Sequence, residues 1–438
     1  MCWSNDGKND GEIMHITIVQ NLIDIIRNKN KGEKKEFVNK QEFIPKKVRS
    51  NRILLVYTRN FLNLDAGNNA YCYEIIKILK NLGYSIDFMS TTSTAPENDF
   101  DNFYDRNKEE GYLIENLYLS TNHKKNKPKN HSKFSIVSDE MVDIYNNLVS
   151  NNNYDYIFIY YVNFLDIITL SKYKLEAKVI LALTDFQSLQ IFYDKKNRGQ
   201  NPLIGLGSFI QDELGLLSKC DEVICISNDE KFFFQRFYGN KPFYFLPYFT
   251  EIELKSNNSK DIDSLFVGSR NNHNINSILW FFDKVYPLLN QNISITVCGK
   301  VSQELKNQHF EKYQKMINSG INFIDYAKDL SLLYARAKIA IVPMVSGTGL
   351  KTKTITAMAY GVPVVTNELG VDGFPDKFEN GCLVTNNPVK FAEYITELLQ
   401  DRNFYSEICK KEKSYYDKYL SYQRAVEILS KIFQKEEF

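Results

Sequence analysis

Two series of alternating apolar strands and amphipathic helices dominate this chain of 438 residues. The first series runs from RILLVYT at 52–58 to PFYFLP at 242–247, and the second from DSLFVGS at 263–269 to CLVT at 382–385. Continuous apolar strands that alternate with helices are typical of parallel sheets with both faces covered. The sequence therefore predicts an α/β fold with two Rossmann-like, doubly wound domains that face each other across a cleft.

The predicted domain boundaries follow from where each series begins and ends. Residues 1–45 hold a polar start, an amphipathic stretch at 16–26 and a charged run, and are interpreted as an N-terminal extension. For 16–26 we favour a docked surface helix, with an interfacial or partner-binding helix as the alternative. The first Rossmann-like domain is predicted at 50–250, the second at 260–410, and a C-terminal crossover segment at 411–438 with one helix at about 414–433.

Composition excludes several classes of function. Lys plus Arg number 54 and Asp plus Glu 53, which gives a formal net charge of +1. This balance gives no electrostatic reason to expect binding to nucleic acid. The seven cysteines form no CxxC pair, as expected of a reduced, intracellular protein. No apolar run approaches the roughly 18–20 residues of a membrane span, and the N-terminus does not resemble a secretory signal. We therefore predict a cytoplasmic location.

The stretch SGTGLKTKTITAMAYG, Ser346 to Gly361, places two lysines where a glycine-rich loop enters a helix. The first turn of a helix is its positive end, so Lys351 and Lys353 are disfavoured there unless an anion is present. Gly347 and Gly349 would let backbone N–H groups approach that anion. The alternative is a tight turn with two solvated lysines.

Two further strand ends carry a glycine and a cation. The motif FVGSR at 266–270 contains Gly268 and Arg270, and His273 follows three residues later. The motif VCGK at 297–300 ends in Gly299 and Lys300. A planar guanidinium and lysine point charges suit a diphosphate. Because ligands of open α/β sheets bind beyond the carboxyl ends of strands, we expect these groups to converge.

These motifs together resemble the C-terminal domain of retaining, group 1 nucleotide-sugar glycosyltransferases, which have the GT-B fold. The similar stretches cover about 263–374 and include ITVCGK and INFIDYAKDLSLLYARAKIAIVPMVSGTGLKTKTITAMAYGVPVVTNELGVDGF. The first half matches more loosely, through AGNNAYCYEIIKILKNLGY and LTDFQSLQIF, so that the resemblance spans roughly 50–430.

The resemblance implies which residues form the site. Lys353 stands where shorter variants of the family keep a lysine, whereas Thr348 and Thr356 replace two glutamates that many relatives carry. The second of these glutamates typically binds the ribose, so Thr356 is the less expected change. The implied catalytic residues are Asp185, Arg270 and Lys353. The implied donor-binding residues are Gly67, Asn68, Gly268, Ser269, Gly299, Lys300, Asp325, Tyr326, Ser346, Gly347, Thr348, Gly349, Leu350, Lys351 and Thr356.

The implied reaction moves a sugar from a nucleotide diphosphate to an acceptor hydroxyl with retention. Arg270, Lys351 and Lys353 would stabilise the departing diphosphate, so neither a metal nor another cofactor is expected. Asp185 would orient the acceptor or the sugar, with a helix N-cap as its alternative role. The expected acceptor is a saccharide, a lipid-linked molecule or a protein, in polysaccharide or glycoconjugate synthesis by family analogy.

Other interpretations stay open at this stage. A catalytically silent GT-B protein would bind an acceptor or act as a partner subunit of another glycosyltransferase, and Thr356 favours that hypothesis. A dinucleotide-dependent oxidoreductase is excluded because no GxGxxG follows the first strand. The basic run at 123–133 is interpreted as a solvated loop, with peripheral contact to anionic lipid at the inner face of the membrane as the alternative.

Overall fold

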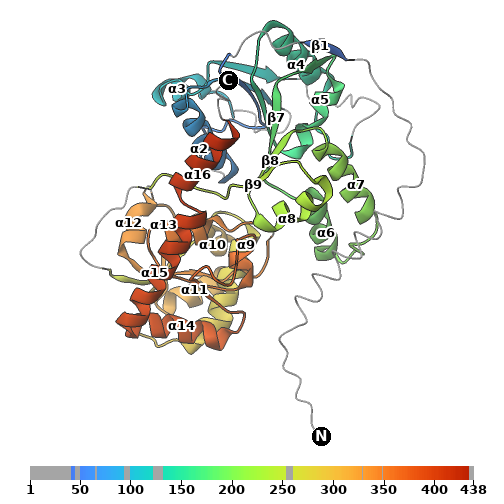
Figure 1. Ribbon diagram of the computed structural model, residues 1–438. Coiled ribbons are helices and arrows are strands. Elements are labelled where there is room, and N and C mark those ends of the chain that lie inside the picture. The colour runs from blue at the N-terminus through green and yellow to red at the C-terminus, as the bar shows by residue number, and fades with distance from the viewer. Residues whose placement is uncertain are drawn as a thin grey trace. The chain divides into compact units, whose positions relative to one another are not determined.

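The computed structural model describes residues 41–44, 50–64, 67–92, 99–121, 132–252, 260–327, 329–347 and 349–433. Its two large sheets, both parallel, confirm the prediction of two Rossmann-like domains (Figure 1). None of the helices that it describes is long and apolar enough to span a membrane. The predicted helix at 16–26 and nearly all of the basic run at 123–133 lie outside the described residues.

The N-terminal domain contains a seven-stranded sheet in the order β4-β3-β2-β5-β7-β8-β9. Its strands are β2 (Arg52–Val56), β3 (Ser85–Thr91), β4 (Asn116–Ser120), β5 (Tyr156–Tyr160), β7 (Lys178–Leu183), β8 (Glu222–Cys225) and β9 (Phe243–Phe245). Its helices are α2 (Gly67–Asn81), α3 (Phe103–Glu109), α4 (Asp139–Asn151), α5 (Asp166–Leu170), α6 (Gln187–Asn197), α7 (Leu206–Leu217) and α8 (Asn228–Tyr238).

The C-terminal domain contains a six-stranded sheet in the order β12-β11-β10-β13-β14-β15. Its strands are β10 (Ile262–Val267), β11 (Ile295–Cys298), β12 (Asn322–Ile324), β13 (Ala337–Val342), β14 (Val364–Thr366) and β15 (Leu383–Val384). Its helices are α9 (Asn272–Trp280), α10 (Val301–Gln308), α11 (Phe310–Asn318), α12 (Leu330–Arg336), α13 (Thr352–Ala359), α14 (Pro388–Gln400) and α15 (Arg402–Tyr419). The next helix, α16 (Tyr422–Ile432), packs against α15 and α2.

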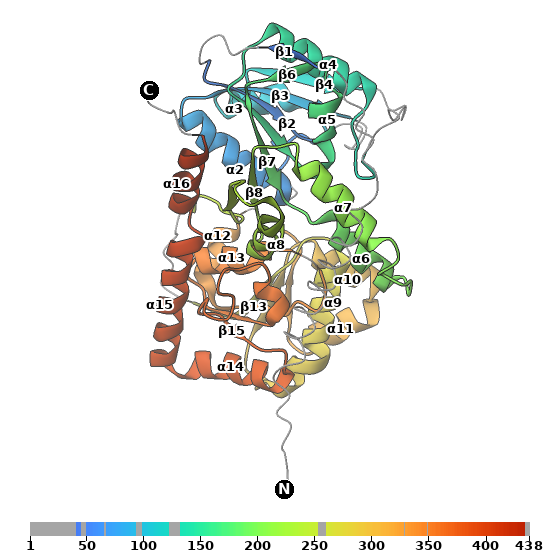
Figure 2. The ribbon, with the colours of Figure 1, turned by 45° about the vertical axis from the view of Figure 1, so that its right-hand side comes forward.

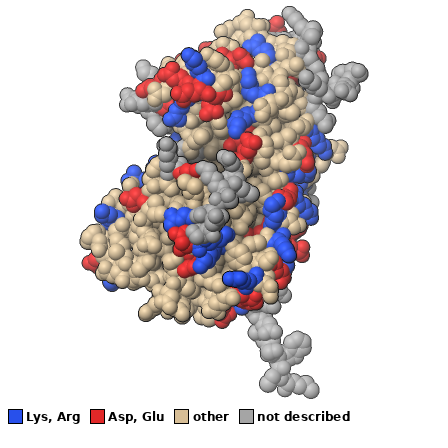
Figure 3. Space-filling model, turned by 90° about the vertical axis from the view of Figure 1, so that its left-hand side faces the viewer, with Lys and Arg blue, Asp and Glu red and all other residues tan. Residues whose placement is uncertain are grey.

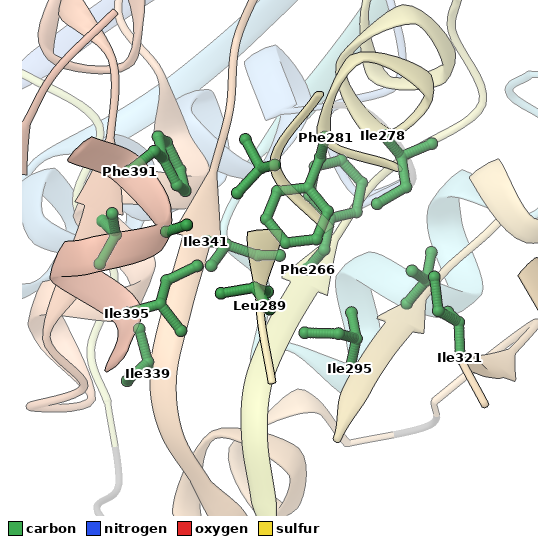
Figure 4. Packing of buried hydrophobic residues seen from close by; sticks show 14 of the residues in the cluster. Phe266, Ile278, Phe281, Leu289, Ile295, Ile321, Ile339, Ile341, Phe391 and Ile395 are labelled. Carbon is green, nitrogen blue, oxygen red and sulfur yellow. The ribbon is translucent and has the colours of Figure 1, made fainter. Parts of the chain in front are cut away.

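Alternate residues of the central strands serve two separate cores in the C-terminal domain. Phe266 of β10 and Ile341 of β13 pack with Phe281 and Phe391 on one face of the sheet (Figure 4). Leu265, the neighbour of Phe266, packs on the opposite face with residues of α12, α13 and α15. Because successive side chains of a strand point to opposite faces, burial on both faces requires an uninterrupted apolar run. That requirement explains why the positions of these strands could be predicted from the apolar runs of the sequence.

Both sheets contain a point where the strand order reverses. In the C-terminal sheet it lies between β10 and β13, and in the N-terminal sheet between β2 and β5. The paired strands are parallel, so their carboxyl ends share one edge. Open α/β sheets bind ligands in the crevice beyond that edge, next to such a reversal. The fold therefore points to the loops after β10 and β13 before any side chain is considered.

Several predicted helices have different bounds in the structure. The apolar spacing from Ile278 to Leu288 predicts a helix at 276–289, but the helix begins earlier, at Asn272, because Asn271 caps it, and beyond Trp280 it continues as π and 3-10 turns up to Leu288. The sequence predicts one helix at 303–318, and the structure divides it into α10 and α11 at His309. The polar residues GNNA predict a loop, but they form the first turn of α2.

The C-terminal segment contains two helices where one was expected. The break between α15 and α16 falls at Leu420, and the Ser421 hydroxyl accepts from the Arg424 N–H at 3.2 Å to start α16 (Figure 2). A hydroxyl that satisfies a free N–H group is a common helix start signal.

The end of the predicted N-terminal extension forms part of the fold. Strand β1 (Glu42–Ile44) pairs in parallel with β6 (Tyr173–Leu175) in a separate two-stranded sheet. The Gln41 side-chain amide donates to the carbonyls of Ile168 and Ser171, both at 2.9 Å. Within the predicted extension, residues 41–44 are therefore joined to the chain around β6.

Glu412 of α15 is a buried carboxyl group, and burial raises its pKa to about 8 from 4.5. Its Oε1 accepts from the Val364 N–H at 2.8 Å. Because this group binds a proton more tightly in the folded chain, its contribution to the free energy of unfolding should be complete below pH 4.5 and should fall as the pH rises from 4.5 through about 8. We expect this carboxyl group alone to account for about 3 to 5 kcal/mol of that fall.

Denaturant unfolding at several pH values between 5 and 9 measures the effect. Glu412→Gln keeps an oxygen for the Val364 N–H but cannot ionise, so its free energy of unfolding should fall less over this range than that of the wild type. Glu407→Gln is the matched control, because Glu407 lies on the same helix with an exposed side chain. Equal pH slopes for Glu412→Gln and the wild type would contradict the prediction.

Candidate functional site

Four strand ends meet at the carboxyl edge of the C-terminal sheet. The Gly268 N–H donates to the Cys298 carbonyl at 2.9 Å and the Gly299 N–H to the Ile324 carbonyl at 2.8 Å, which joins the ends of β10, β11 and β12. The loop after β13 joins them through the contact between His273 Nδ1 and Ser346 Oγ, at 2.8 Å. The strand ends that the sequence singled out therefore form one continuous surface.

Gly268 and Gly299 are required by close packing between these loops. Gly299 has φ +109°, and a Cβ added to it would lie 2.3 Å from the Gly268 carbonyl oxygen. A Cβ on Gly268 would lie 2.8 Å from Phe266 Cε1 and 3.0 Å from Val301 Cγ1. The family resemblance implies that both glycines border the diphosphate, and the close packing requires a glycine at each position even without a ligand.

Lys353 is a cation held by neutral groups. Its Nζ donates to Asn274 Oδ1, lies 3.5 Å from Met344 Sδ and stands 5.0 Å from the centre of the Phe266 ring. None of its contacts among the described residues is with an anion. Burial, followed by the nearby charge of Lys351, lowers the pKa of Lys353 to about 8. An anion bound here would offset both the desolvation of the Lys353 ammonium group and its repulsion by Lys351.

Lys351 lies at the N-cap of α13 and is buried. Its Nζ donates to the Gly349 carbonyl at 2.5 Å and the Gly347 carbonyl at 3.4 Å, so the side chain folds back over the glycine loop. Burial lowers its pKa, and Asp372 opposes that shift. Both lysines thus stand at the positive end of a helix, as the sequence predicted, with carbonyl and amide oxygens as acceptors.

The remaining predicted cations have different surroundings. Arg270 pairs with Glu304 of α10, and its side chain is 68% exposed, so a carboxylate already balances its charge. Lys300 is exposed at the N-cap of α10. His273 has a lowered pKa because of burial and the charges of Lys351 and Lys353. The charges of Lys351 and Lys353 are therefore more available to an anionic ligand than the charge of Arg270, which Glu304 balances.

The other predicted donor-binding residues follow β12 and β13. Asp325 and Tyr326 are exposed beyond β12, and Tyr326 is 73% exposed. Leu350 packs against the core under α13, and Thr348 lies outside the described residues. The Thr356 hydroxyl donates to the Thr352 carbonyl of its own helix at 2.9 Å, a contact common for threonine within helices.

Asp185 of the N-terminal domain does not cap a helix. Glu213 does so, because its carboxylate accepts from the N–H groups of Gln187 and Ser188 at 2.9 and 3.0 Å at the start of α6. Asp185 Oδ1 accepts from Gln190 Nε2 at 2.7 Å, and burial raises the pKa of this carboxyl group. The alternative role as N-cap is therefore wrong, and a half-buried carboxyl group follows β7.

The other predicted residues of the N-terminal domain, Gly67 and Asn68, open helix α2. Tyr161, which no sequence motif marks, directly follows β5 at the reversal of the N-terminal sheet. This tyrosine has φ +78° and stacks on Tyr57 with ring centres 5.7 Å apart. Such a φ costs on the order of 1–3 kcal/mol for a residue other than glycine, and this kind of strain is often found at functional sites.

Sequence reasoning also missed Asn274, which links two of the loops. It is 3% exposed, and its side chain contacts both Ser269 and Lys353. No sequence signal marks it beyond its place in the first turn of α9. Within the described part of the chain, no three His, Cys, Asp or Glu side chains gather where they could hold a metal ion.

Part of the chain is similar in sequence to a known protein family. Residues 262–401 match the family model described as glycosyl transferases group 1. A 44.6 kDa protein of the cps region of Klebsiella pneumoniae is 30% identical over 141 residues. That match covers 30% of this chain and 35% of the relative, so the shared part is about a third of each protein.

Solved structures extend the likeness in fold to most of the chain. Sucrose-phosphate synthase from Thermosynechococcus elongatus matches with a TM-score of 0.62 and 14% identity, over 87% of this chain and 98% of the other. HepE from Anabaena, in complex with UDP-glucose, matches with a TM-score of 0.58 and 12% identity over the same shares, 87% and 98%. TarM from S. aureus matches with a TM-score of 0.58 and 10% identity, over 88% and 100%.

These findings define a protein with the two Rossmann-like domains of the GT-B fold. Residues 262–401 of its second domain are similar to the group 1 glycosyl transferases. The loops after β10, β11, β12 and β13 lie within those residues.

Proposed function

We propose that this protein transfers a sugar from a nucleotide-diphosphate donor to an acceptor hydroxyl. The observation that carries the proposal is the Lys353 ammonium, which is held by neutral groups at the strand-order reversal of a group 1 glycosyl transferase domain. A buried cation at a ligand-binding edge favours an anionic substrate group. The diphosphate of a nucleotide sugar supplies that group.

The solved relatives support the choice of substrates. HepE was solved with UDP-glucose, and TarM with UDP and alpha-GlcNAc-glycerol. By likeness to them, we propose a nucleotide sugar as donor and a saccharide as acceptor, with a lipid-linked or protein acceptor as alternatives. We also propose a cytoplasmic role in polysaccharide or glycoconjugate synthesis. In keeping with a reducing compartment, the six cysteines within the described residues are free thiols.

The proposed mechanism is electrostatic. As the sugar leaves, negative charge grows on the diphosphate, and Lys351, Lys353 and the start of α13 would stabilise it without reorganising. Protein cations at this place would perform a task that a metal performs elsewhere, so we propose a metal-independent reaction. Retention would follow if the leaving phosphate serves as the base, with Asp185 orienting the acceptor or the sugar.

The second candidate function is a silent GT-B protein that binds an acceptor or a partner glycosyltransferase. Thr356 favours it, because a threonine bonded to its own helix replaces the glutamate that typically holds the donor ribose in relatives. Arg270 also favours it, since Glu304 already balances its charge.

Calorimetric titration with UDP-, GDP-, TDP- and ADP-sugars separates the two candidates. The proposal predicts that one donor binds and is then hydrolysed slowly, or transferred when an acceptor is supplied. Failure of all four to bind would support the silent protein.

Thr356→Glu is expected to tighten donor binding by about 10-fold or more. A carboxylate at this position would accept charge-assisted hydrogen bonds from the ribose diol, worth about 1.5–3 kcal/mol. Titration of the best-binding nucleotide sugar into both proteins measures the change. Thr352→Glu is the control, because it adds the same charge one turn earlier on α13. Equal gains in both variants would mean that the site does not place a ribose near residue 356.

A further inference from the structure

Asn274 connects the two sides of the strand-order reversal in the C-terminal sheet. It lies in the first turn of α9, after β10, and its side chain reaches Lys353 of α13, after β13. Its Nδ2 donates to the Ser269 carbonyl at 2.9 Å and to Ser269 Oγ at 3.2 Å. Its Oδ1 accepts from Lys353 Nζ. One buried side chain therefore fixes both a loop and a cation.

The chemistry of its neighbours requires an amide at this position. The Ser269 carbonyl can only accept a hydrogen bond, and the Lys353 ammonium can only donate one. An aspartate would satisfy the lysine but would turn an oxygen toward the Ser269 carbonyl. An alanine would satisfy neither. Asparagine alone among these three holds both groups, and it does so without adding charge.

We propose that Asn274 is a positioning residue that aims Lys353 at the substrate diphosphate while leaving the lysine charge unbalanced. This inference rests on the proposed function, which it deepens. A carboxylate in the same place would form an ion pair with Lys353 and compete with the diphosphate. The neutral amide oxygen fixes the position of the Lys353 ammonium group but does not neutralise its charge. That charge therefore stays available to interact with the diphosphate.

The charged groups around Lys353 fit this role. Lys351, on the same helix, lowers the pKa of Lys353, and both lysines lower that of His273 on α9. Asp372, beyond β14, acts on Lys351. An anionic ligand would raise the pKa values of both lysines, so it should bind most tightly below about pH 8, where Lys353 is protonated.

The test is a calorimetric titration of the tightest binder among UDP, GDP, TDP and ADP, between pH 6.5 and 9.5. For the wild type we expect affinity to fall as the pH rises through about 8. Asn274→Asp should weaken binding at pH 7 at least 10-fold and move the fall in affinity to higher pH, because the new carboxylate raises the pKa of Lys353. Asn274→Ala should weaken binding less and leave the midpoint of the fall near that of the wild type.

A double-mutant cycle tests whether Asn274 acts through the lysine. In a Lys353→Met background, Asn274→Asp should change affinity by less than 3-fold, as expected of coupled residues. If Asn274→Asp does not fold, the cycle is run with Asn274→Ala, again with a smaller effect expected in the Lys353→Met background.

Three results would overturn the inference while leaving the proposed function intact. They are wild-type affinity in Asn274→Asp, an unchanged pH midpoint in that variant, and additive effects of the two substitutions. If the wild type binds none of the four diphosphates and none of the four nucleotide sugars, the proposed function itself fails.

Discussion

Replacement of Lys353 by methionine is expected to weaken binding of a nucleoside diphosphate by about 10- to 100-fold, because a charge-assisted hydrogen bond is worth about 1.5–3 kcal/mol. Binding of the parent nucleoside should change little, since the lysine lies at the phosphate end of the proposed site. The same substitution should leave the free energy of unfolding unchanged or raise it by about 1 kcal/mol, because it removes a cation whose burial lowers its pKa. Loss of function with retained stability is the signature of a binding residue.

Calorimetry with the diphosphate and the nucleoside measures the first effect, and denaturant unfolding measures the second. Lys306→Met is the matched control, since Lys306 is exposed on α10 in the same domain. Equal losses for diphosphate and nucleoside would contradict a phosphate role for Lys353. So would a loss that Lys306→Met reproduces.

Gly299→Ala is expected to destabilise the C-terminal domain by about 3 kcal/mol or more. The backbone strain at φ +109° contributes on the order of 1–3 kcal/mol. In addition, the new Cβ would meet the Gly268 carbonyl oxygen at 2.3 Å, and a backbone atom cannot turn aside as a side chain can. The two strand ends would have to separate, so ligand binding should be lost as well.

Thermal and denaturant unfolding test this expectation. Gly67→Ala is the matched control, because a Cβ there meets nothing within 4 Å and φ is not positive. That variant should match the wild type or gain up to about 1 kcal/mol. Wild-type stability in Gly299→Ala would show that the ends of β10 and β11 tolerate separation.

The alternation of strands and helices made the fold predictable from sequence. Strands such as β10 and β13 are buried on both faces, so their apolar runs are continuous and easily recognised. Helix ends were harder to predict, because they depend on local hydrogen bonds. The Asn271 cap starts α9 earlier than its apolar pattern suggests, and the Ser421 cap separates α15 from α16. Shorter or more polar elements, such as β1 and β6, left too weak a pattern.

The candidate site was predictable only in part. Glycines and lysines at strand ends are visible in the sequence, and the structure joins their loops into one surface. The pairing of Arg270 with Glu304 was not visible, because it depends on the position of α10 in space. Asn274 was missed for the same reason, since its role comes from two partners on different elements.

Charge totals give only coarse information about the site. The near balance of basic and acidic residues agrees with the mixed blue and red side chains on the face shown in Figure 3. The lysines that matter are few and partly hidden, so their effect does not appear in a sum over the chain. Local burial, which composition cannot report, gives Lys351 and Lys353 their altered pKa values.

Mapping of backbone amide shifts during titration with the best-binding nucleotide sugar tests most directly whether a diphosphate binds at the carboxyl edge of the C-terminal sheet. The account predicts that the largest shifts fall on Gly268, Ser269, Gly347 and Gly349, and that they are lost in Lys353→Met. Shifts that avoid these loops, or that persist unchanged in the variant, would contradict it.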